Sequence, residues 1–123
     1  MKLAHTMIRV RDLNASIDFY TNFLGLHEVR RRTLGDEATL VFLSDASNNY
    51  YLELTHNHDN RDYELGTQFG HLALTCKDLD AVRDQVIANG WEYRESKPSA
   101  RTPYIFISDP DGYDIEILQE PKP

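Results

Sequence analysis

Hydrophobic and polar residues along the chain follow two simple periodicities. Short segments in which apolar and polar residues alternate predict β-strands, and apolar residues three and four positions apart predict helices. The first half of the chain reads as strand, helix, strand, strand, strand, and the second half repeats that order. The predicted strands cover 3–10, 27–33, 38–44, 49–56, 70–76, 91–95, 103–108 and 113–119, and the predicted helices cover 14–24 and 79–89.

Capping and turn residues mark the ends of these segments. Asp12 or Asn14 is expected to cap the first helix, because a short polar side chain accepts hydrogen bonds from the free N–H groups of a helix start. Gly25 is expected to end that helix with a positive φ. The Asp-Pro-Asp-Gly sequence at 109–112 predicts a tight turn before the last strand, and residues 57–69 read as a linker.

The two halves also share sequence. Residues 5–15 (HTMIRVRDLNA) resemble residues 71–81 (HLALTCKDLDA), which begin 66 positions later. Each half has a glutamate in its last strand, Glu53 in the first and Glu116 in the second. The spacing from the histidine that opens each half to this glutamate is 48 residues in the first half and 45 in the second. Matched residues at matched distances indicate an internal duplication.

A duplicated βαβββ module predicts an α+β fold in which the two modules form a curled mixed sheet. The modules are expected to cover about residues 1–60 and 68–123 and to make one domain together (1–123). A chain of 123 residues is long enough for one compact domain.

Strand periodicity suggests where the polar residues meet. Alternate side chains share a face of a strand, so polar faces from both modules could bring together His5, Glu53, His71 and Glu116. Two imidazoles and two carboxylates, without a thiolate, suit Zn²⁺, Ni²⁺, Co²⁺ or Fe²⁺. A single strand histidine is more often structural than a ligand, but the repeated placement favours a shared metal site.

The remaining histidines are His27, His56 and His58. They lack counterparts in the repeat, and we interpret them as surface residues. Because His56 and His58 flank a single residue, they could at most bind a surface metal weakly.

Charge and composition narrow the class of protein. Lys and Arg number 13 against 20 Asp and Glu, which gives a net charge of −7 and argues against binding to nucleic acid or an anionic membrane. Cys76 is the one cysteine, so no intrachain disulfide can form. The N-terminal residues lack the apolar stretch of a signal peptide, and no apolar run has the length of a membrane span. We therefore expect a cytoplasmic enzyme or binding domain.

At the histidines and glutamates the sequence resembles glyoxalase I (lactoylglutathione lyase), a family of the vicinal oxygen chelate superfamily, over almost the whole chain. The Asp-Pro-Asp-Gly turn followed by a glutamate is shared widely in that superfamily. The combination of His-Thr-Met-x-Arg-Val with Glu-Leu-Thr-x-Asn is more specific for glyoxalase I. The segments that carry the resemblance are 5–10, 16–21, 23–26, 52–57, 63–67, 70–71 and 109–116.

The resemblance implies a metal site and an assembly. One divalent ion would be bound by His5, Glu53, His71 and Glu116. The compact chain resembles the Ni²⁺- or Co²⁺-activated bacterial type, with Zn²⁺ possible. The resemblance also implies a homodimer whose sites lie between subunits, each taking His5 and Glu53 from one chain and His71 and Glu116 from the other.

The resemblance also implies a reaction. The substrate would be the hemithioacetal of glutathione, the co-substrate, with methylglyoxal, converted through an enediolate into S-D-lactoylglutathione. Glu116 would move the proton, and Glu53 could serve for the opposite stereochemistry. Arg9 and Asn57 match positions that hold the glutamyl end of glutathione, and a guanidinium binds a carboxylate with two hydrogen bonds. Arg101 lies where the family has a Lys-Gly-rich segment and is a further candidate for substrate binding.

Three alternatives stay open. The thiol could be another one, such as trypanothione. The chain could be a thiol transferase or dioxygenase of the same superfamily, although these need only two histidines and one glutamate, so Glu53 argues against them. It could also be a metal-free protein that sequesters a small molecule, although such relatives commonly lack the ligand set.

Overall fold

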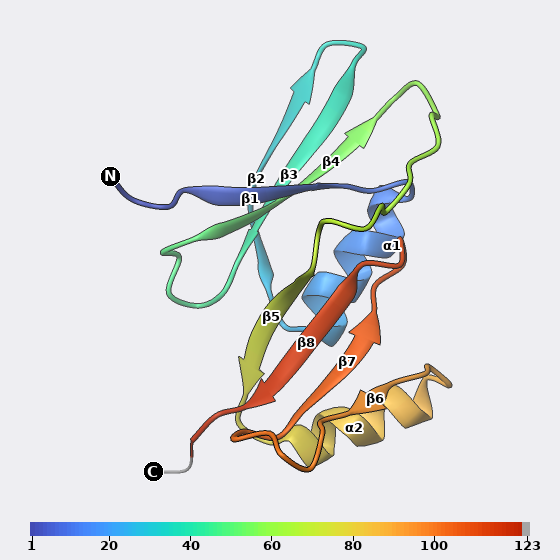
Figure 1. Cartoon of the computed structure of the whole chain (residues 1–123). Helices are drawn as coiled ribbons and strands as arrows, with labels where there is room; N and C mark the ends of the chain where they lie inside the picture. The colour runs from blue at the N-terminus through green and yellow to red at the C-terminus, as the bar shows by residue number, and fades with distance from the viewer. Residues whose placement is uncertain (122–123) are drawn as a thin grey trace. The chain divides into compact units, whose positions relative to one another are not determined.

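The computed structural model describes residues 1–121 and divides into two compact units, Met1–Glu64 and Leu65–Pro123. Each unit contains one four-stranded sheet (Figure 1). The boundary between the units lies in residues 58–70, which connect the two sheets without a helix or strand.

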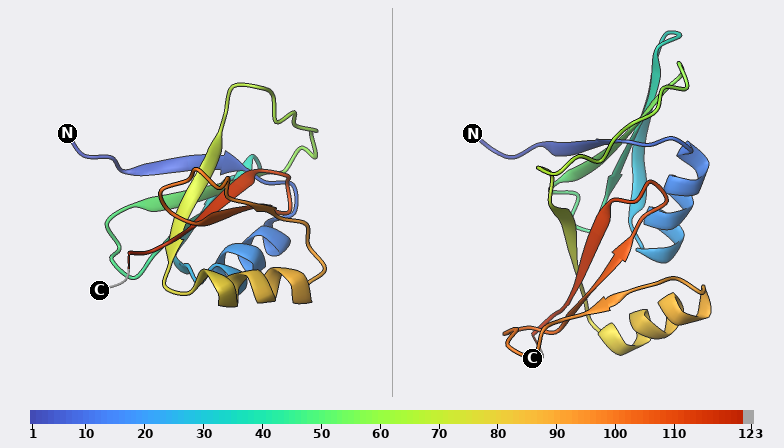
Figure 2. Two further views of the ribbon diagram at one scale, coloured as in Figure 1. Left: turned by 60° about the horizontal axis from the view of Figure 1, so that its bottom comes forward. Right: turned by 45° about the vertical axis from the view of Figure 1, so that its right-hand side comes forward.

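The first unit has the order strand, helix, strand, strand, strand. Its sheet has the order β1-β4-β3-β2, with β1 parallel to β4 and the other neighbours antiparallel. In Figure 2, β2 and β3 form a long, twisted hairpin. The elements are β1 (His5–Arg9), α1 (Leu13–Asp18), the π-helix η1 (Phe19–Phe23), β2 (His27–Leu34), β3 (Ala38–Ser44) and β4 (Tyr51–Asn57).

The second unit repeats this arrangement. Its sheet has the order β5-β8-β7-β6, again with one parallel pair, β5 and β8, and antiparallel pairs elsewhere. The α+β fold of two βαβββ modules is therefore confirmed, with a separate open mixed sheet in each module. The elements are β5 (His71–Cys76), α2 (Leu79–Ala88), β6 (Arg94–Glu95), β7 (Tyr104–Ser108) and β8 (Asp114–Gln119).

The helix caps follow the repeat. The Asp12 carboxylate accepts a hydrogen bond from the Ala15 N–H at 3.0 Å, and the Asp78 carboxylate accepts one from the Ala81 N–H at 3.1 Å. Both helices therefore begin at an N-cap aspartate, which confirms one of the two candidates for the first helix. Gly25 follows the π-helix with φ 79°, also as expected.

The first helix differs from the prediction in its second half. Residues 19–23 form a π-helix, in which the Leu24 N–H donates to the Phe19 carbonyl five residues back at 3.0 Å. The apolar stripe predicted one regular helix over 14–24. The apolar stripe looks the same whether each backbone N–H donates to the carbonyl four residues back or five residues back. The sequence pattern therefore did not predict the π-helix.

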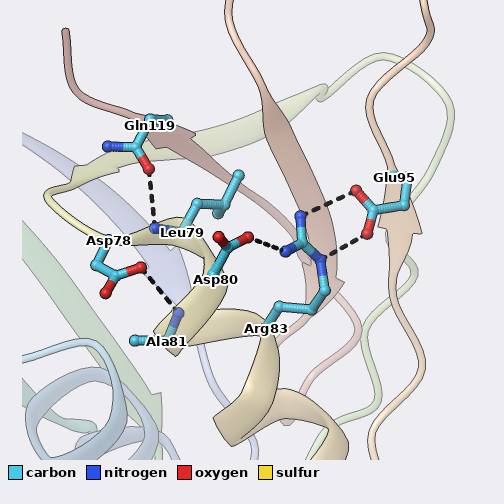
Figure 3. Close-up of polar contacts among 7 residues, drawn as sticks. All are labelled: Asp78, Leu79, Asp80, Ala81, Arg83, Glu95 and Gln119. Atoms are coloured by element: carbon cyan, nitrogen blue, oxygen red, sulfur yellow. Dashed lines mark hydrogen bonds and ion pairs between the residues drawn. The ribbon is translucent and has the colours of Figure 1, made fainter. Parts of the chain in front are cut away.

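Side-chain contacts fix α2 to its own sheet (Figure 3). The Gln119 side-chain oxygen on β8 accepts a hydrogen bond from the Leu79 N–H at 3.0 Å. Arg83 donates to Asp80 on the same helix and to Glu95 on β6, each at 2.6 Å. These contacts join the helix to both an inner strand and the edge strand of the second sheet.

Buried aliphatic residues alternate along the strands and leave the intervening positions for polar side chains. On β8, Ile115 and Ile117 are buried, and Glu116 lies between them on the opposite face. On β4, Leu54 is buried on the face opposite Glu53. The sheets therefore present their glutamates on the side away from these aliphatic residues. No helix in residues 1–121 is long and apolar enough to span a membrane.

Candidate metal centre

The first predicted ligand pair lies across the parallel strands β1 and β4. The Nε2 atom of His5 is 3.3 Å from the Oε1 atom of Glu53. Met7 is the register partner of Glu53, so the glutamate lies two residues further along than the histidine, on the same face. The parallel pairing of the first and last strands of the module thus brings together two residues 48 positions apart.

The second pair has the same construction. The Nε2 atom of His71 on β5 is 3.4 Å from the Oε1 atom of Glu116 on β8, and the register partner of Glu116 is Ala73, two residues after the histidine. Each unit therefore holds one imidazole nitrogen and one carboxylate oxygen side by side, at nearly the same distance.

An aromatic ring lies beside each pair. Phe42 on β3 is the register partner of Glu53, and the His5 ring meets it edge-on, with centroids 5.7 Å apart and an interplanar angle of 88°. In the second unit, Phe106 pairs with Glu116, and the His71 ring meets it at 4.9 Å and 88°. Each imidazole therefore lies against the edge or face of a fixed aromatic ring, in the arrangement that aromatic pairs favour.

An arginine completes each set on the edge strand. The Arg30 guanidinium carbon lies 4.2 Å from the centroid of the Phe42 ring, and that of Arg94 lies 5.1 Å from the Phe106 ring. In each sheet, four residues, one from each strand, thus form a row of side chains across one face. We call them the first row (His5, Glu53, Phe42 and Arg30) and the second row (His71, Glu116, Phe106 and Arg94).

The phenylalanines and arginines of these rows were not among the residues predicted from the sequence. A usable signal existed, because Phe42 and Phe106 are 64 residues apart, as are Arg30 and Arg94, close to the repeat offset of 66. The residues lie in segments without other similarity, however, and a phenylalanine in an apolar strand looks like an ordinary core residue.

The two glutamates differ in one contact. The Thr55 hydroxyl donates a hydrogen bond of 2.6 Å to the Oε2 atom of Glu53, and both residues are buried, at 7% and 8% exposure. The position two residues after Glu116 is Leu118, which has no hydroxyl. Within the described part of the chain, no protein group donates to the second oxygen of Glu116. Glu53 is therefore held at both oxygens, and Glu116 at one.

The donor chemistry of the pairs fits a divalent metal. Imidazole nitrogen and carboxylate oxygen suit Zn²⁺, Ni²⁺, Co²⁺ and Fe²⁺, and the two nitrogens and two oxygens together give the usual number of protein ligands. Neither unit has, among its described residues, a third His, Cys, Asp or Glu that joins its pair to form a group of three. Each pair alone therefore offers two donors.

The predicted substrate-binding residues lie in both units. Arg9 is exposed on the same face of β1 as His5. Asn57, at the end of β4, donates from Nδ2 to the Tyr63 hydroxyl at 2.6 Å and lines a small pocket of about 120 Å³ together with Arg11. Arg101 is exposed in the segment between β6 and β7 of the second unit.

The other histidines only partly match their interpretation as surface residues. His27 and His58 are exposed, but His56 is half-buried, and its Nδ1 atom is 3.2 Å from the Val10 carbonyl oxygen. The His58 ring hydrogen-bonds the Thr39 hydroxyl at 2.9 Å. His56 is less exposed than the other two because the parallel pairing of β1 and β4 places the end of β4 beside Val10.

Comparisons with known proteins agree with this fold. The family model of the Glyoxalase/Bleomycin resistance protein/Dioxygenase superfamily matches residues 2–117. The chain is 40% identical to a lactoylglutathione lyase from Neisseria meningitidis serogroup A, over 98% of this chain and 91% of that protein. It is 41% identical to a probable lactoylglutathione lyase from Synechocystis, over 97% of this chain and 95% of that protein.

A solved structure is similar over almost the same length. The trypanothione-dependent glyoxalase I of Leishmania major superimposes with a TM-score of 0.84 at 35% identity, covering 98% of this chain and 87% of that one. The resemblance noted in the sequence is thereby confirmed. The two curated relatives reported above, similar over nearly its full length, are named lactoylglutathione lyase and probable lactoylglutathione lyase, and the chain belongs to the Glyoxalase/Bleomycin resistance protein/Dioxygenase superfamily.

Proposed function

We propose that this chain is a lactoylglutathione lyase, which converts the hemithioacetal of glutathione and methylglyoxal into S-D-lactoylglutathione. The observation that carries the proposal is the occurrence of one His–Glu pair in each unit, at 3.3 and 3.4 Å. The similarity of about 40% to enzymes of this name, over nearly the whole chain, supports the same reaction. We also propose a cytoplasmic location, consistent with a single cysteine and no disulfide.

The metal is proposed to bind between two chains of a homodimer. His5 and Glu53 of one chain would provide two ligands, and His71 and Glu116 of the second chain would provide the other two. This arrangement is supported by the presence of only two suitable donors at each pair within residues 1–121. Ni²⁺ or Co²⁺ is favoured by the compact chain, and Zn²⁺ is compatible with the same donors.

The proposed chemistry moves one proton between adjacent carbons. A bound divalent ion would supply Lewis-acid polarisation of the substrate oxygens. Glu116 would take the proton from the C–H group and return it to the neighbouring carbon by way of the enediolate. The hydroxyl proton would pass from the oxygen on the first carbon to the oxygen on the second, so the atoms balance and the step needs no oxidant or reductant. The second oxygen of Glu116 accepts no hydrogen bond from the described residues, which suits a carboxylate that must reach the substrate.

Glu53 would remain a metal ligand during the reaction, whereas Glu116 would move the proton. Its second oxygen accepts the Thr55 hydroxyl, which restricts the rotation of the carboxylate. It could carry the proton only for the opposite stereochemistry of the substrate. Arg9 and Asn57 are proposed to hold the glutamyl end of glutathione, and Arg101 to contact the substrate from the second unit.

A direct assay tests the reaction. Metal-free protein would be loaded in turn with Ni²⁺, Co²⁺ and Zn²⁺ and mixed with glutathione and methylglyoxal, while the thioester absorbance is recorded. We expect thioester to accumulate with at least one metal, and with the His27→Ala control, because that histidine is exposed outside both pairs. Absence of thioester with all three metals would overturn the proposal.

A further inference from the structure

Few contacts hold the two histidines that open the strand pairs. The side chains of His5 and His71 are 41% and 40% exposed. Apart from the carboxylate of its own pair, neither imidazole has a polar partner within residues 1–121. An exposed imidazole without further contacts can turn about both of its side-chain torsions, which would move Nε2 away from the glutamate.

An aromatic contact stands where a metal-binding histidine usually has a hydrogen bond. Such a histidine is usually oriented by its second ring nitrogen, which donates to a carboxylate, a carbonyl or water. Among the described residues, His5 and His71 have no acceptor of this kind, and a phenylalanine ring lies against each instead. The centroid distances are 5.7 Å to Phe42 and 4.9 Å to Phe106, and both interplanar angles are 88°. The contact therefore recurs in both units with the same perpendicular geometry.

The phenylalanine rings are themselves held in place. Phe42 is buried, with 4% exposure, and the Arg30 guanidinium lies over it at 4.2 Å. Phe106 is half-buried, meets the Tyr104 ring edge-on at 5.5 Å, and has the Arg94 guanidinium over it at 5.1 Å. A ring that is fixed on its other sides can restrict the imidazole packed against it.

We propose that Phe42 and Phe106 are positioning residues for the imidazoles of His5 and His71, an assignment that rests on the proposed function. Each ring holds its histidine with Nε2 facing the glutamate, so both donors of a pair are aligned before a metal binds. A histidine side chain has about three χ1 rotamers and two ring orientations, so an unrestrained imidazole would be in the ligating orientation about one sixth of the time. The apparent metal affinity falls in proportion to that fraction.

The two rings should not matter equally. In the first unit, the Thr55 hydroxyl also holds the Glu53 carboxylate beside His5. Glu116 has no such donor among the described residues, so the second pair depends more on its aromatic contact. We therefore expect Phe106 to contribute more to metal affinity than Phe42.

The test removes the ring, keeps it, or changes the opposite face of the same strand. Phe106→Leu leaves an apolar side chain without a ring, and Phe106→Tyr retains the ring. Ile107→Val is the matched control, because Ile107 is buried on the other face of β7, opposite Ile115, and belongs to neither row. Thermal unfolding of the metal-free variants measures how much stability each change costs.

Co²⁺ is the probe, because it is one of the metals that suit the donors and its bound form absorbs visible light. Competition with a chromophoric chelator gives its affinity, and the visible spectrum reports the arrangement of its ligands. We expect Phe106→Leu to bind Co²⁺ roughly three- to sixfold more weakly and with altered visible bands. Phe106→Tyr and Ile107→Val should keep the wild-type affinity and spectrum, and Phe42→Leu should weaken binding by a smaller factor.

Three results would overturn the inference. The first is a Phe106→Leu variant with the affinity and spectrum of the wild type. The second is an equal loss of affinity in Ile107→Val, which would trace the effect to stability rather than to the orientation of His71. The third is a Phe106→Tyr variant that binds as weakly as Phe106→Leu, since tyrosine retains the ring.

Metal binding and the thioester assay together separate this inference from the proposed function. A wild-type protein that binds Co²⁺ tightly but makes no thioester with any metal refutes the reaction, and the comparison of Phe106 variants still decides the positioning role. A wild-type protein that makes thioester, together with an unaffected Phe106→Leu variant, refutes the positioning role alone. A wild-type protein that binds none of Ni²⁺, Co²⁺ and Zn²⁺ refutes both.

Discussion

Replacing Thr55 by valine removes one hydroxyl from the proposed metal site and changes little else. Valine keeps a β-branched side chain of similar volume, which suits the strand. The lost group donates the 2.6 Å hydrogen bond to the Oε2 atom of Glu53, whose side chain is only 10% exposed. In the variant this oxygen has no donor among the described residues, and little water can reach it.

Two magnitudes follow from this contact. A hydrogen bond to a buried charged group contributes about 1.5 to 3 kcal/mol, so the free energy of unfolding of the metal-free protein should fall by about 2 kcal/mol. A partner that orients a metal ligand typically changes metal affinity by about 10- to 100-fold, so we expect Thr55→Val to bind metal at least about tenfold more weakly.

The assay compares Thr55→Val with Thr55→Ser. Serine keeps the hydroxyl and loses one methyl group, so it should lose stability but bind metal nearly as tightly as the wild type. Urea unfolding of metal-free protein gives the stability, and competition with a chromophoric chelator gives the metal affinity. If Thr55→Val and Thr55→Ser bind metal equally well, the hydrogen bond does not position Glu53 and the reasoning is refuted.

Three further predictions concern other parts of the chain. Glu116→Gln should retain measurable metal binding and lose most turnover; full activity would remove Glu116 from proton transfer. Asp78→Ala removes the N-cap of α2 and should lower the free energy of unfolding in urea by about 1 kcal/mol, whereas an unchanged midpoint would contradict the capping role. Burial raises the pKa of the Cys76 thiol, so less thiolate is present at neutral pH. Alkylation by iodoacetamide, followed by mass spectrometry, should be slower than for free cysteine at pH 7 and should accelerate as pH rises; a faster reaction at pH 7 would contradict it.

Much of the fold could be predicted because it depends on local sequence. The alternating strands, the aspartate cap of the first helix and the positive φ of Gly25 each follow from a few neighbouring residues. The internal repeat added the long-range information that the two halves share one topology. The π-helix at Phe19–Phe23 escaped prediction because its apolar stripe is compatible with either hydrogen-bond pattern.

The site could be predicted only where the repeat marked it. His5 and Glu53 were singled out by their counterparts, and the structure brings each His beside the Glu of its own module. The positions of Phe42 and Arg30 beside His5 and Glu53 depend on strand order and register, which pair residues far apart in sequence. Thr55 lies two residues from Glu53 on the same strand, so strand periodicity places it on the same face but does not give the hydrogen bond. Local periodicity contains no such information, so these contacts required the structure.

The central claim is that one ion is bound by the pair of one chain and the other kind of pair from a second chain. Its most direct test is metal content after mixing two variants, His5→Ala and His71→Ala. Each variant alone lacks a ligand at every site, so neither should retain a tightly bound ion or make thioester. A mixture that exchanges subunits should regain metal, because each mixed dimer has one site with all four ligands. If either variant alone retains one tightly bound ion per chain, or if the exchanged mixture regains none, the two pairs do not share an ion between chains.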